Sequence, residues 1–425
     1  MKYLLFFVFV IFVSVTANAQ LAGKFDFGVS RANGSTVITA GDVYSKEKSF
    51  GFEPDADVKC GSDGCTSDKP FYFSAKVPEG NYRVTVRFGH SQFATAPVVK
   101  AELRRLMIES FITAPGKFVT KSFIVNVRRP EITSVPPAVA GGVFSVKLKD
   151  REKTSEQWAW DEKLTLEFNG TQPSIATIAI ERVSVPTVFL LGDSTVCDQP
   201  GEPYASWGQM ITAFFGPNAA VANHAESGES LKSSFGARRL DKVVSLIKPG
   251  DFLLIQYGHN DMKERGDGIG AFTSYKASLK QFTDAAKAKG ATVILINPMR
   301  RRTFDPSGKF ITNSHGDYPE AVRQAAKEEN VAFIDLNGKS KELYEAFGKE
   351  GSGVLFKEGD GTHHNAFGAY QLAKIIVQSI RDQKLPLAKY LIKDWKAYDP
   401  RRPDAAAGFK VPTSPAVADL KPLGS

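Results

Sequence analysis

Four short segments of the chain combine residue types that together can cleave an ester. They are GDSTV at 192–196, NHAESGES at 223–230, GHND at 258–261 and DGTHH at 360–364. Ser194 offers a hydroxyl nucleophile on a turn where it can face solvent, and His363 offers an imidazole that can take its proton. Asp360, three residues before His363, can hold that imidazole in one orientation. These residues predict a hydrolase with a Ser-His-Asp triad.

The same segments also contain hydrogen-bond donors for the transition state. Ester cleavage passes through a tetrahedral intermediate whose negative oxygen needs such donors. We predict that the backbone amides of Ser194 and Gly228 and the side chain of Asn260 supply them. A glycine at 228 lets the backbone approach the substrate closely. We expect His259 and Asp261 to orient Asn260 rather than to carry protons.

Residues 20–183 show the two-residue period of half-buried strands. The clearest case is YRVTVRF at 82–88, where apolar and polar residues alternate, and the same alternation occurs at 144–148 and 164–168. Turn-forming pairs such as Gly141-Gly142 and Asn169-Gly170 separate these segments. The pattern predicts an all-β sandwich.

Residues 184–385 instead alternate helix-period segments with short continuous apolar runs. These runs lie at 188–191, 252–255, 293–296 and 331–334. Continuous apolar strands are buried on both faces, as in the parallel sheet of an α/β domain. Sites in such sheets form at the carboxyl ends of the strands, where the four segments are expected to meet. We expect the proline-rich residues 386–425 to form an extended tail over the domain surface.

In this order, the four segments resemble those of the SGNH (GDSL) hydrolase superfamily. Its sequence blocks carry a catalytic serine, an oxyanion glycine, an oxyanion asparagine and an Asp-x-x-His pair. Together with SWGQ at 206–209, they look most like rhamnogalacturonan acetylesterases of carbohydrate esterase family 12. The resemblance covers about residues 186–385. It implies a flavodoxin-like three-layer α/β/α fold and deacetylation of pectic polysaccharide. In layout, the first half is similar to the galactose-binding-like modules that precede such esterases.

Three further residues have to be weighed against these roles. His364 competes with His363 as the base, and the Asp-x-x-His spacing selects His363. His224 has no matching role and is expected to be a satisfied loop residue. Cys197 could be a nucleophile, but no cysteine-hydrolase pattern places a histidine or aspartate beside it. We therefore predict a buried structural thiol.

The charge balance favours an anionic partner. The chain has 54 Lys and Arg residues against 46 Asp and Glu residues, a net charge of +8. The basic residues are scattered in pairs, so nucleic acid is not indicated. The run Arg300, Arg301 and Arg302 follows the strand at 293–296 and should lie near the catalytic face. Its guanidinium groups suit the carboxylates of galacturonate, although such a run can also be a solvated loop.

The first 19 residues have the features of a secretory signal peptide. Lys2 precedes an apolar run at 4–13, and residues 17–19 form an A-x-A cleavage site. A membrane anchor is the alternative, but a spanning helix needs about 20 apolar residues. We therefore expect a secreted or periplasmic protein without a membrane anchor. Cys60 and Cys65 bracket a turn-rich loop and are predicted to form a disulfide in that oxidising compartment.

The sequence thus predicts an exported carbohydrate O-acetylesterase that acts on an acetylated, anionic polysaccharide without a metal or cofactor. An acetylxylan esterase, a lipase or a thioesterase on the same scaffold are the enzymatic alternatives. A glycan-binding protein with an inert hydrolase half is the alternative of another class. The predicted sandwich, with Trp158 and Trp160, either binds glycan or supports the fold of the second half.

Overall fold

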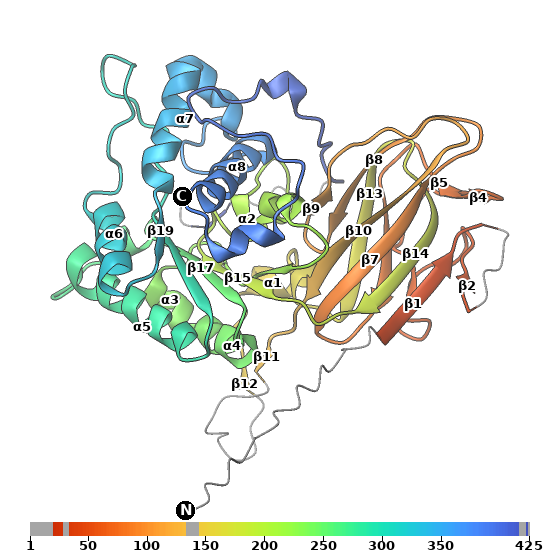
Figure 1. Ribbon diagram of the computed structural model, residues 1–425, viewed down its shortest axis with the longest axis horizontal. Coiled ribbons are helices and arrows are strands. Elements are labelled where there is room, and N and C mark those ends of the chain that lie inside the picture. Colours follow the sequence, from red (N-terminus) through yellow and green to blue (C-terminus); the bar gives the residue numbers. More distant parts are fainter. Residues whose placement is uncertain (1–19, 29–33, 133–143, 416–421, 424–425) are drawn as a thin grey trace, which may run out of the picture.

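The structure is a computed structural model that describes residues 20–28, 34–132, 144–415 and 422–423. Two parts lie side by side in Figure 1: a pair of sheets from the first half of the chain, and a helix-covered parallel sheet from the second half. The predicted signal peptide at 1–19 and the turn Gly141-Gly142 lie outside the described residues. Within those residues, no helix is long and apolar enough to cross a membrane.

Two mainly antiparallel sheets form a sandwich from residues 20–182. The first sheet has the order β10-β7-β14-β1-β2, with β5 also paired to β14 and β4 to β5, and the second has the order β3-β6-β13-β8-β9. Their bounds are β1 (Gln20–Asp26), β2 (Thr36–Val37), β3 (Phe50–Phe52), β4 (Lys59–Gly61), β5 (Gly64–Thr66), β6 (Phe71–Lys76), β7 (Gly80–Gly89), β8 (Ala96–Ala101), β9 (Arg105–Ile108), β10 (Phe118–Val127), β13 (Lys163–Thr171) and β14 (Ser174–Arg182).

The predicted alternation along 82–88 is confirmed in β7. Tyr82, Val84, Val86 and Phe88 are all 0% exposed and share one apolar core with Phe73 of the second sheet. Because side chains of a strand point alternately to its two faces, the intervening residues are more exposed. Cys60 of β4 and Cys65 of β5 are joined by a disulfide that links this hairpin.

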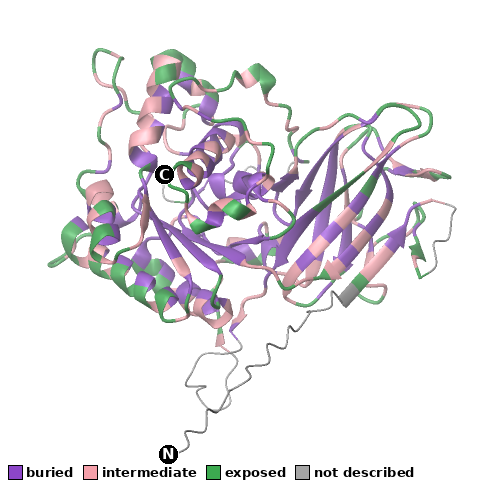
Figure 2. Ribbon diagram, viewed as in Figure 1, coloured by how far each residue is buried: buried purple, intermediate pink, exposed green. Residues whose placement is uncertain are grey.

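The second half is built on a five-stranded parallel sheet with the order β16-β15-β17-β18-β19. The strands are β15 (Thr187–Gly192), β16 (Ala220–Asn223), β17 (Phe252–Gln256), β18 (Thr292–Ile296) and β19 (Ala332–Ile334). Every residue of β15, β16 and β17 is buried, as Figure 2 shows. The second strand of this half, β16, lies at the edge of the sheet next to the first strand, β15. This is the flavodoxin-like strand order that the sequence resemblance implied.

Helices cover both faces of this sheet. Alternate residues of β15 face opposite layers: Phe189 and Leu191 pack in one apolar core, and Val188 and Leu190 pack in another. The first core includes residues of α3 (Leu231–Gly236), α4 (Arg239–Leu246), α5 (Lys276–Lys287) and α6 (Tyr318–Glu328). The second includes residues of α2 (Trp207–Met210), α7 (Leu336–Gly351) and α8 (Ala366–Asp382). The second half is therefore a three-layer α/β/α structure.

The two halves share buried contacts rather than a simple linker. Val98 of β8 and Leu106 of β9 belong to the same apolar core as Trp207 of α2. Arg105 Nε donates to Asp198 Oδ2 over 2.8 Å, with both side chains at most 2% exposed. Removing one partner of such a pair leaves a buried charge, at a cost of about 3–5 kcal/mol. The sandwich therefore supports the fold of the second half.

A second connection involves the segment between β10 and β13 of the sandwich. Strands β11 (Glu131–Ile132) and β12 (Phe144–Ser145) pair with each other, and the short helix α1 (Asp150–Lys153) follows. The backbone N–H of Lys147 donates to the carbonyl of Ala237 over 3.0 Å. This segment therefore lies against the second half just before α1.

The C-terminal residues are packed more firmly than the predicted surface tail. Leu387, in the 3₁₀ helix at Pro386–Tyr390, is fully buried, and Leu391 and Tyr398 join the same core. Further along, Ser414 Oγ donates to Glu167 Oε2 over 2.7 Å. The prolines prevent long helices and strands, but the apolar residues between them still enter the core.

Candidate active site

The predicted nucleophile sits directly after the first parallel strand. Strand β15 ends at Gly192, and a side chain there would place its Cβ 2.7 Å from the carbonyl oxygen of Gln256 on β17. Only a glycine allows the two strand ends to approach so closely. The chain then turns, with the N–H groups of Val196 and Cys197 both donating to the Asp193 carbonyl over 3.0 Å. This turn holds Ser194 at the carboxyl edge of the sheet.

Ser194, His363 and Asp360 form a continuous chain of hydrogen bonds. Ser194 Oγ lies 2.9 Å from His363 Nε2, and His363 Nδ1 lies 2.9 Å from Asp360 Oδ2. The other carboxylate oxygen of Asp360 accepts from the backbone N–H groups of Thr362 (2.7 Å) and His363 (3.0 Å). The backbone of this loop thus holds the Asp360 carboxylate next to Nδ1 of the His363 ring.

The charge on Asp360 is stabilised by this arrangement. Partial burial tends to raise the pKa of the carboxyl group, but hydrogen bonds from the His363 ring and from two backbone N–H groups outweigh it. The net result is a pKa well below the usual range of an aspartate. The group is therefore ionised at neutral pH and can stabilise a positive charge on His363.

Side chains around the nucleophile turn also hold it in place. Asp193 Oδ1 accepts from the Thr195 N–H over 2.9 Å, and its Oδ2 lies 3.2 Å from His259 Nδ1. Gln199 Nε2 donates to the carbonyl of Ser194 over 2.5 Å. Sequence reasoning did not identify Gln199, because a glutamine five residues after a serine carries no distinctive signal. The nucleophile's backbone is thus fixed on both sides.

The predicted oxyanion donors have free hydrogen-bonding capacity. In the described part of the chain, no acceptor is bonded to the backbone N–H of Ser194 or of Gly228. Asn260 Nδ2 donates to the Glu229 carbonyl over 3.0 Å, which uses one of its two hydrogens. Gly228 has φ +77°, a conformation that favours glycine. These three groups thus keep N–H hydrogens for a substrate oxygen.

The neighbours of Asn260 have a different role from the one expected. His259 bonds to Asp193, and Asp261 Oδ1 accepts from the Leu231 N–H over 2.9 Å. Neither contacts the Asn260 side chain, which is oriented by the Glu229 carbonyl. Burial raises the pKa of Asp261 to about 7. His259 and Asp261 therefore fix the surrounding loops rather than the amide itself.

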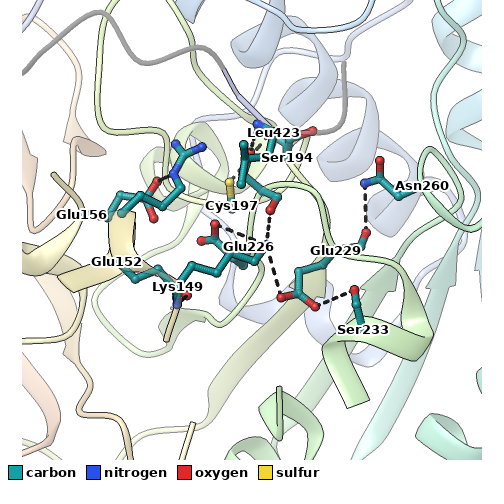
Figure 3. Close-up of polar contacts among 12 residues, drawn as sticks. Lys149, Glu152, Glu156, Ser194, Cys197, Glu226, Glu229, Ser233, Asn260 and Leu423 are labelled. Carbon is teal, nitrogen blue, oxygen red and sulfur yellow. Dashed lines mark hydrogen bonds and ion pairs between the residues drawn. The ribbon is translucent and has the colours of Figure 1, made fainter. Parts of the chain in front are cut away.

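The site is less exposed than the expected solvent-facing turn. Ser194 is 3% exposed and His363 is 2% exposed, since Gln199 and the His363 loop pack against the turn. Leu423 lies against the loop that holds Gly228, and its backbone N–H donates to Ser227 Oγ over 2.9 Å (Figure 3). A side chain on Gly228 would place its Cβ 2.9 Å from Leu423 Cβ. The last described residues thus reach the predicted oxyanion loop.

The three arginines of the predicted substrate cluster point to different partners. Arg301 Nε donates to Thr362 Oγ1 over 3.2 Å, beside His363. Arg302 instead donates from Nε to Ser352 Oγ over 2.9 Å and to the Lys349 carbonyl near the end of α7. The Arg300 backbone N–H is bonded to Ser340 on α7. Of the three, only Arg301 has a side chain bonded to the residues around the site, because successive residues of an irregular loop diverge.

The remaining candidates have no hydrogen bond to the reacting side chains, although Cys197 Sγ lies 3.9 Å from the Ser194 carbonyl. His364 Nε2 lies 2.8 Å from the Tyr344 hydroxyl, and Cys197 is a free, buried thiol, as predicted. The expectation for His224 was wrong: the ring is fully buried near Trp160, and neither nitrogen has a hydrogen-bond partner among the described residues. The described residues contain no cluster of three or more His, Cys, Asp or Glu side chains that could hold a metal ion.

The sequence of this half is similar to that of known proteins. The model of the GDSL-like lipase/acylhydrolase family matches residues 190–370. Rhamnogalacturonan acetylesterase RhgT of Bacillus subtilis (strain 168) is 40% identical over 220 residues, which cover 48% of this chain and 94% of that protein. The probable rhamnogalacturonan acetylesterase YesY of the same organism is 34% identical over 214 residues, covering 49% and 98%.

A third relative extends beyond this half. The uncharacterized esterase YxiM of Bacillus subtilis (strain 168) is 27% identical over 389 residues, which cover 87% of this chain and 93% of that protein. The fold and these similarities define a carboxylic ester hydrolase with the SGNH hydrolase fold. The chain belongs to the GDSL-like lipase/acylhydrolase family.

Proposed function

We propose that this protein removes O-acetyl groups from a pectic polysaccharide of the rhamnogalacturonan type through a Ser-His-Asp acyl-enzyme mechanism. The observation that carries the mechanism is the hydrogen-bond chain from Ser194 through His363 to Asp360. The two relatives named as rhamnogalacturonan acetylesterases support the substrate class. Arg301, which has no carboxylate partner among the described residues, supports an anionic sugar polymer because its guanidinium can bind a uronate.

The chemistry proceeds in two balanced steps. His363 Nε2 takes the proton of Ser194 as Oγ bonds to the acetyl carbon, and the carbonyl oxygen becomes an oxyanion. The N–H groups of Ser194 and Gly228 and the Asn260 amide donate to that oxyanion. The sugar oxygen then leaves with the proton from His363. Water attacks the acetyl-serine in the same way, His363 takes its proton, and acetate leaves as Ser194 recovers its hydroxyl hydrogen.

Asp360 has an electrostatic role in both steps. Its carboxylate faces the Nδ1 hydrogen of His363, so it holds the ring with Nε2 toward Ser194. It also stabilises the imidazolium that forms when the serine proton is taken. The low pKa of Asp360 keeps this charge present throughout the reaction.

We further propose that the sandwich is a galactose-binding-like accessory module that contacts glycan. A cavity of about 650 Å³ at its edge supports this, since half-buried Tyr44 and Trp158 line it together with exposed Lys46 and Gln157. Aromatic rings and a few polar groups are the usual lining of a ligand site. Replacing Trp158 with Ala in the inactive Ser194→Ala protein should weaken its retention on acetylated pectin, and unchanged retention would contradict the module's binding role.

We also propose that the protein is exported. The signal-like residues 1–19 and the Cys60–Cys65 disulfide, a bond that persists in oxidising compartments, support this. Fractionation of the native host should find the processed chain outside the cytoplasm. Recovery of the unprocessed chain in the cytoplasm would refute export.

The substrate proposal is tested with a panel of acetyl esters. We expect the purified protein to release acetate fastest from acetylated rhamnogalacturonan, more slowly from acetylated xylan, and to cleave short-chain but not long-chain nitrophenyl esters. Faster release from xylan would identify an acetylxylan esterase, and a preference for long acyl chains would identify a lipase. No acetate from any member would refute the esterase function.

A further inference from the structure

One cation from outside the α/β/α half reaches the predicted oxyanion loop. Lys149, the residue before α1, donates a hydrogen bond from Nζ to the backbone carbonyl of Ser227. The same ammonium lies 3.4 Å from Glu229 Oε1 and 3.8 Å from Glu226 Oε1 (Figure 3). It thus contacts three of the four residues of the loop at 226–229. Nothing in the motifs around Ser194 indicates this residue.

The carbonyl that Lys149 binds belongs to a particular peptide unit. Ser227 supplies its C=O and Gly228 supplies its N–H, and the only cis peptide bond among the described residues precedes Pro203. In a planar trans peptide, the C=O and N–H point in opposite directions. A hydrogen bond that fixes the Ser227 carbonyl therefore also fixes the direction of the Gly228 N–H. A cationic donor on the oxygen also polarises the peptide and strengthens its N–H as a donor.

Gly228 depends on such a contact more than other residues would. A glycine at φ +77° has wide conformational freedom, so its peptide plane depends on hydrogen bonds; one of these, from the Glu229 N–H to the Glu226 carbonyl over 3.3 Å, closes the turn around it. The loop is also held by Arg239 Nε, which donates to Glu229 Oε1 over 3.3 Å, and by the Leu423 N–H, which donates to Ser227 Oγ over 2.9 Å. Those contacts involve side chains of the loop, whereas Lys149 binds the carbonyl of the Ser227–Gly228 peptide itself.

Lys149 is itself held firmly in position. Its backbone N–H donates to Glu152 Oε2 over 2.8 Å, and the same oxygen accepts from Arg239 Nη2 over 2.7 Å. The side chains of Glu152 and Arg239 are both 0% exposed. A buried ion pair thus anchors the start of α1 to α4, and the Lys149 side chain extends from this anchor to the loop.

We propose that Lys149 is a positioning residue for the oxyanion hole: it holds the Ser227–Gly228 peptide so that the Gly228 N–H points at the developing oxyanion. The inference rests on the proposed acyl-enzyme mechanism. Lys149 touches neither substrate nor Ser194 and acts only through this peptide. Part of the transition-state stabilisation of the hydrolase half is therefore supplied by the segment between β10 and β13 of the sandwich.

The test compares Lys149→Met with Lys153→Met, using the full chain and a small acetyl nitrophenyl ester. Lys153 is a matched control, since it lies four residues further on, with 58% of its side chain exposed and paired only with the exposed Asp150. Removing a whole oxyanion donor costs about 10²- to 10³-fold in kcat, so a misdirected donor should cost about 10- to 100-fold. KM should stay within about threefold, because the donor acts in the transition state. Lys149→Arg should restore most of kcat.

Two further measurements separate positioning from folding and from the mechanism itself. Thermal melting identifies any loss of fold in Lys149→Met; if that variant is unfolded, Lys149→Gln replaces it in the same comparison. The rate at which diethyl nitrophenyl phosphate modifies Ser194 should fall in parallel with kcat, because its phosphoryl oxygen occupies the same hole. A folded Lys149 variant with kcat equal to that of Lys153→Met overturns the inference. Full activity of Ser194→Ala would instead overturn the mechanism on which the inference rests.

Discussion

His364 Nε2 and the Tyr344 hydroxyl lie 2.8 Å apart, in a region where both side chains are at most 2% exposed. Burial lowers the pKa of His364 to about 3, so this ring is neutral at the pH where an esterase works. The neighbouring ring of His363 instead bridges Ser194 and Asp360. Of these two adjacent histidines, His364 is thus part of the packed core, and His363 is part of the candidate active site.

The two histidines should differ sharply when replaced. His363→Ala removes the proposed base and should lower the kcat of the folded protein by about 10³-fold or more, in addition to the loss of stability that truncating a buried ring causes. His364→Ala leaves a cavity and an unpaired tyrosine hydroxyl, so it should lower the free energy of unfolding by about 2–4 kcal/mol while the folded fraction keeps most of its activity. Acetate release and thermal melting of both variants measure this. The reverse ranking of activities would mean that His364 is the base.

Asn260→Ala tests the oxyanion hole. The variant loses one donor to the transition state, so kcat should fall by about 10²- to 10³-fold with KM nearly unchanged. Steady-state kinetics on a small acetyl ester separate the two parameters. A change confined to KM would make Asn260 a substrate-binding residue instead. Asn313, whose Nδ2 donates to the Gly316 carbonyl on an exposed loop, provides the control substitution.

The position of the site could be predicted from the sequence because parallel strands fix it. Strands β15 and β17 are continuous apolar runs, and Ser194 and Asn260 follow them within four residues. Adjacent parallel strands end at the same edge of a sheet, so any polar residues there must be close. The spacing of Asp360 and His363 on one loop predicted their contact for a similar local reason.

Arg301 should be the only arginine of its run that affects the polymer substrate. Arg301→Gln removes a guanidinium beside Thr362, and turnover of acetylated pectin should fall about tenfold, the loss expected for one charged hydrogen bond. A small neutral ester should be nearly unaffected, and added salt should reproduce the loss by screening. Arg300→Gln is the matched control. Equal losses on both substrates would indicate damage to the site rather than a lost uronate contact.

The pH dependence of stability should report the buried carboxyl of Asp261. Its pKa is about 7 in the folded chain because of burial, against an ordinary value of 3.8. The folded state therefore binds the proton more tightly than the unfolded state, and this group lowers stability as pH rises from about 4 through about 7. Asp261→Asn keeps an acceptor for the Leu231 N–H but does not titrate.

Thermal melting of Asp261→Asn and of the parent chain at several pH values measures the effect. The stability of the variant relative to the parent should increase between pH 5 and pH 8, by an amount of the order of a few kcal/mol. A difference that is the same at both pH values would show that Asp261 does not titrate in this window.

Other parts of the site had no local signal in the sequence. Lys149 follows the alternating residues 144–148, which predict only a strand, and its contact with Ser227 depends on how the two halves pack. The directions of Arg300 to Arg302 depend on an irregular loop, where no repeating geometry places the side chains. Likewise, the placement of Leu423 against Gly228 follows from the packing of the residues after 385, whose prolines indicate only that regular helices are absent.

Trapping the acetyl-enzyme tests the central claim most directly. The protein is mixed with acetylated rhamnogalacturonan, quenched in acid during turnover, and digested for mass spectrometry, while acetate is measured in parallel. We predict that an acetyl group appears on the peptide containing Ser194, and that Ser194→Ala shows neither this adduct nor more than about 10⁻³ of the parent's acetate release. Acetate release by a folded Ser194→Ala protein near the parent rate, or an adduct on another residue, would contradict the account.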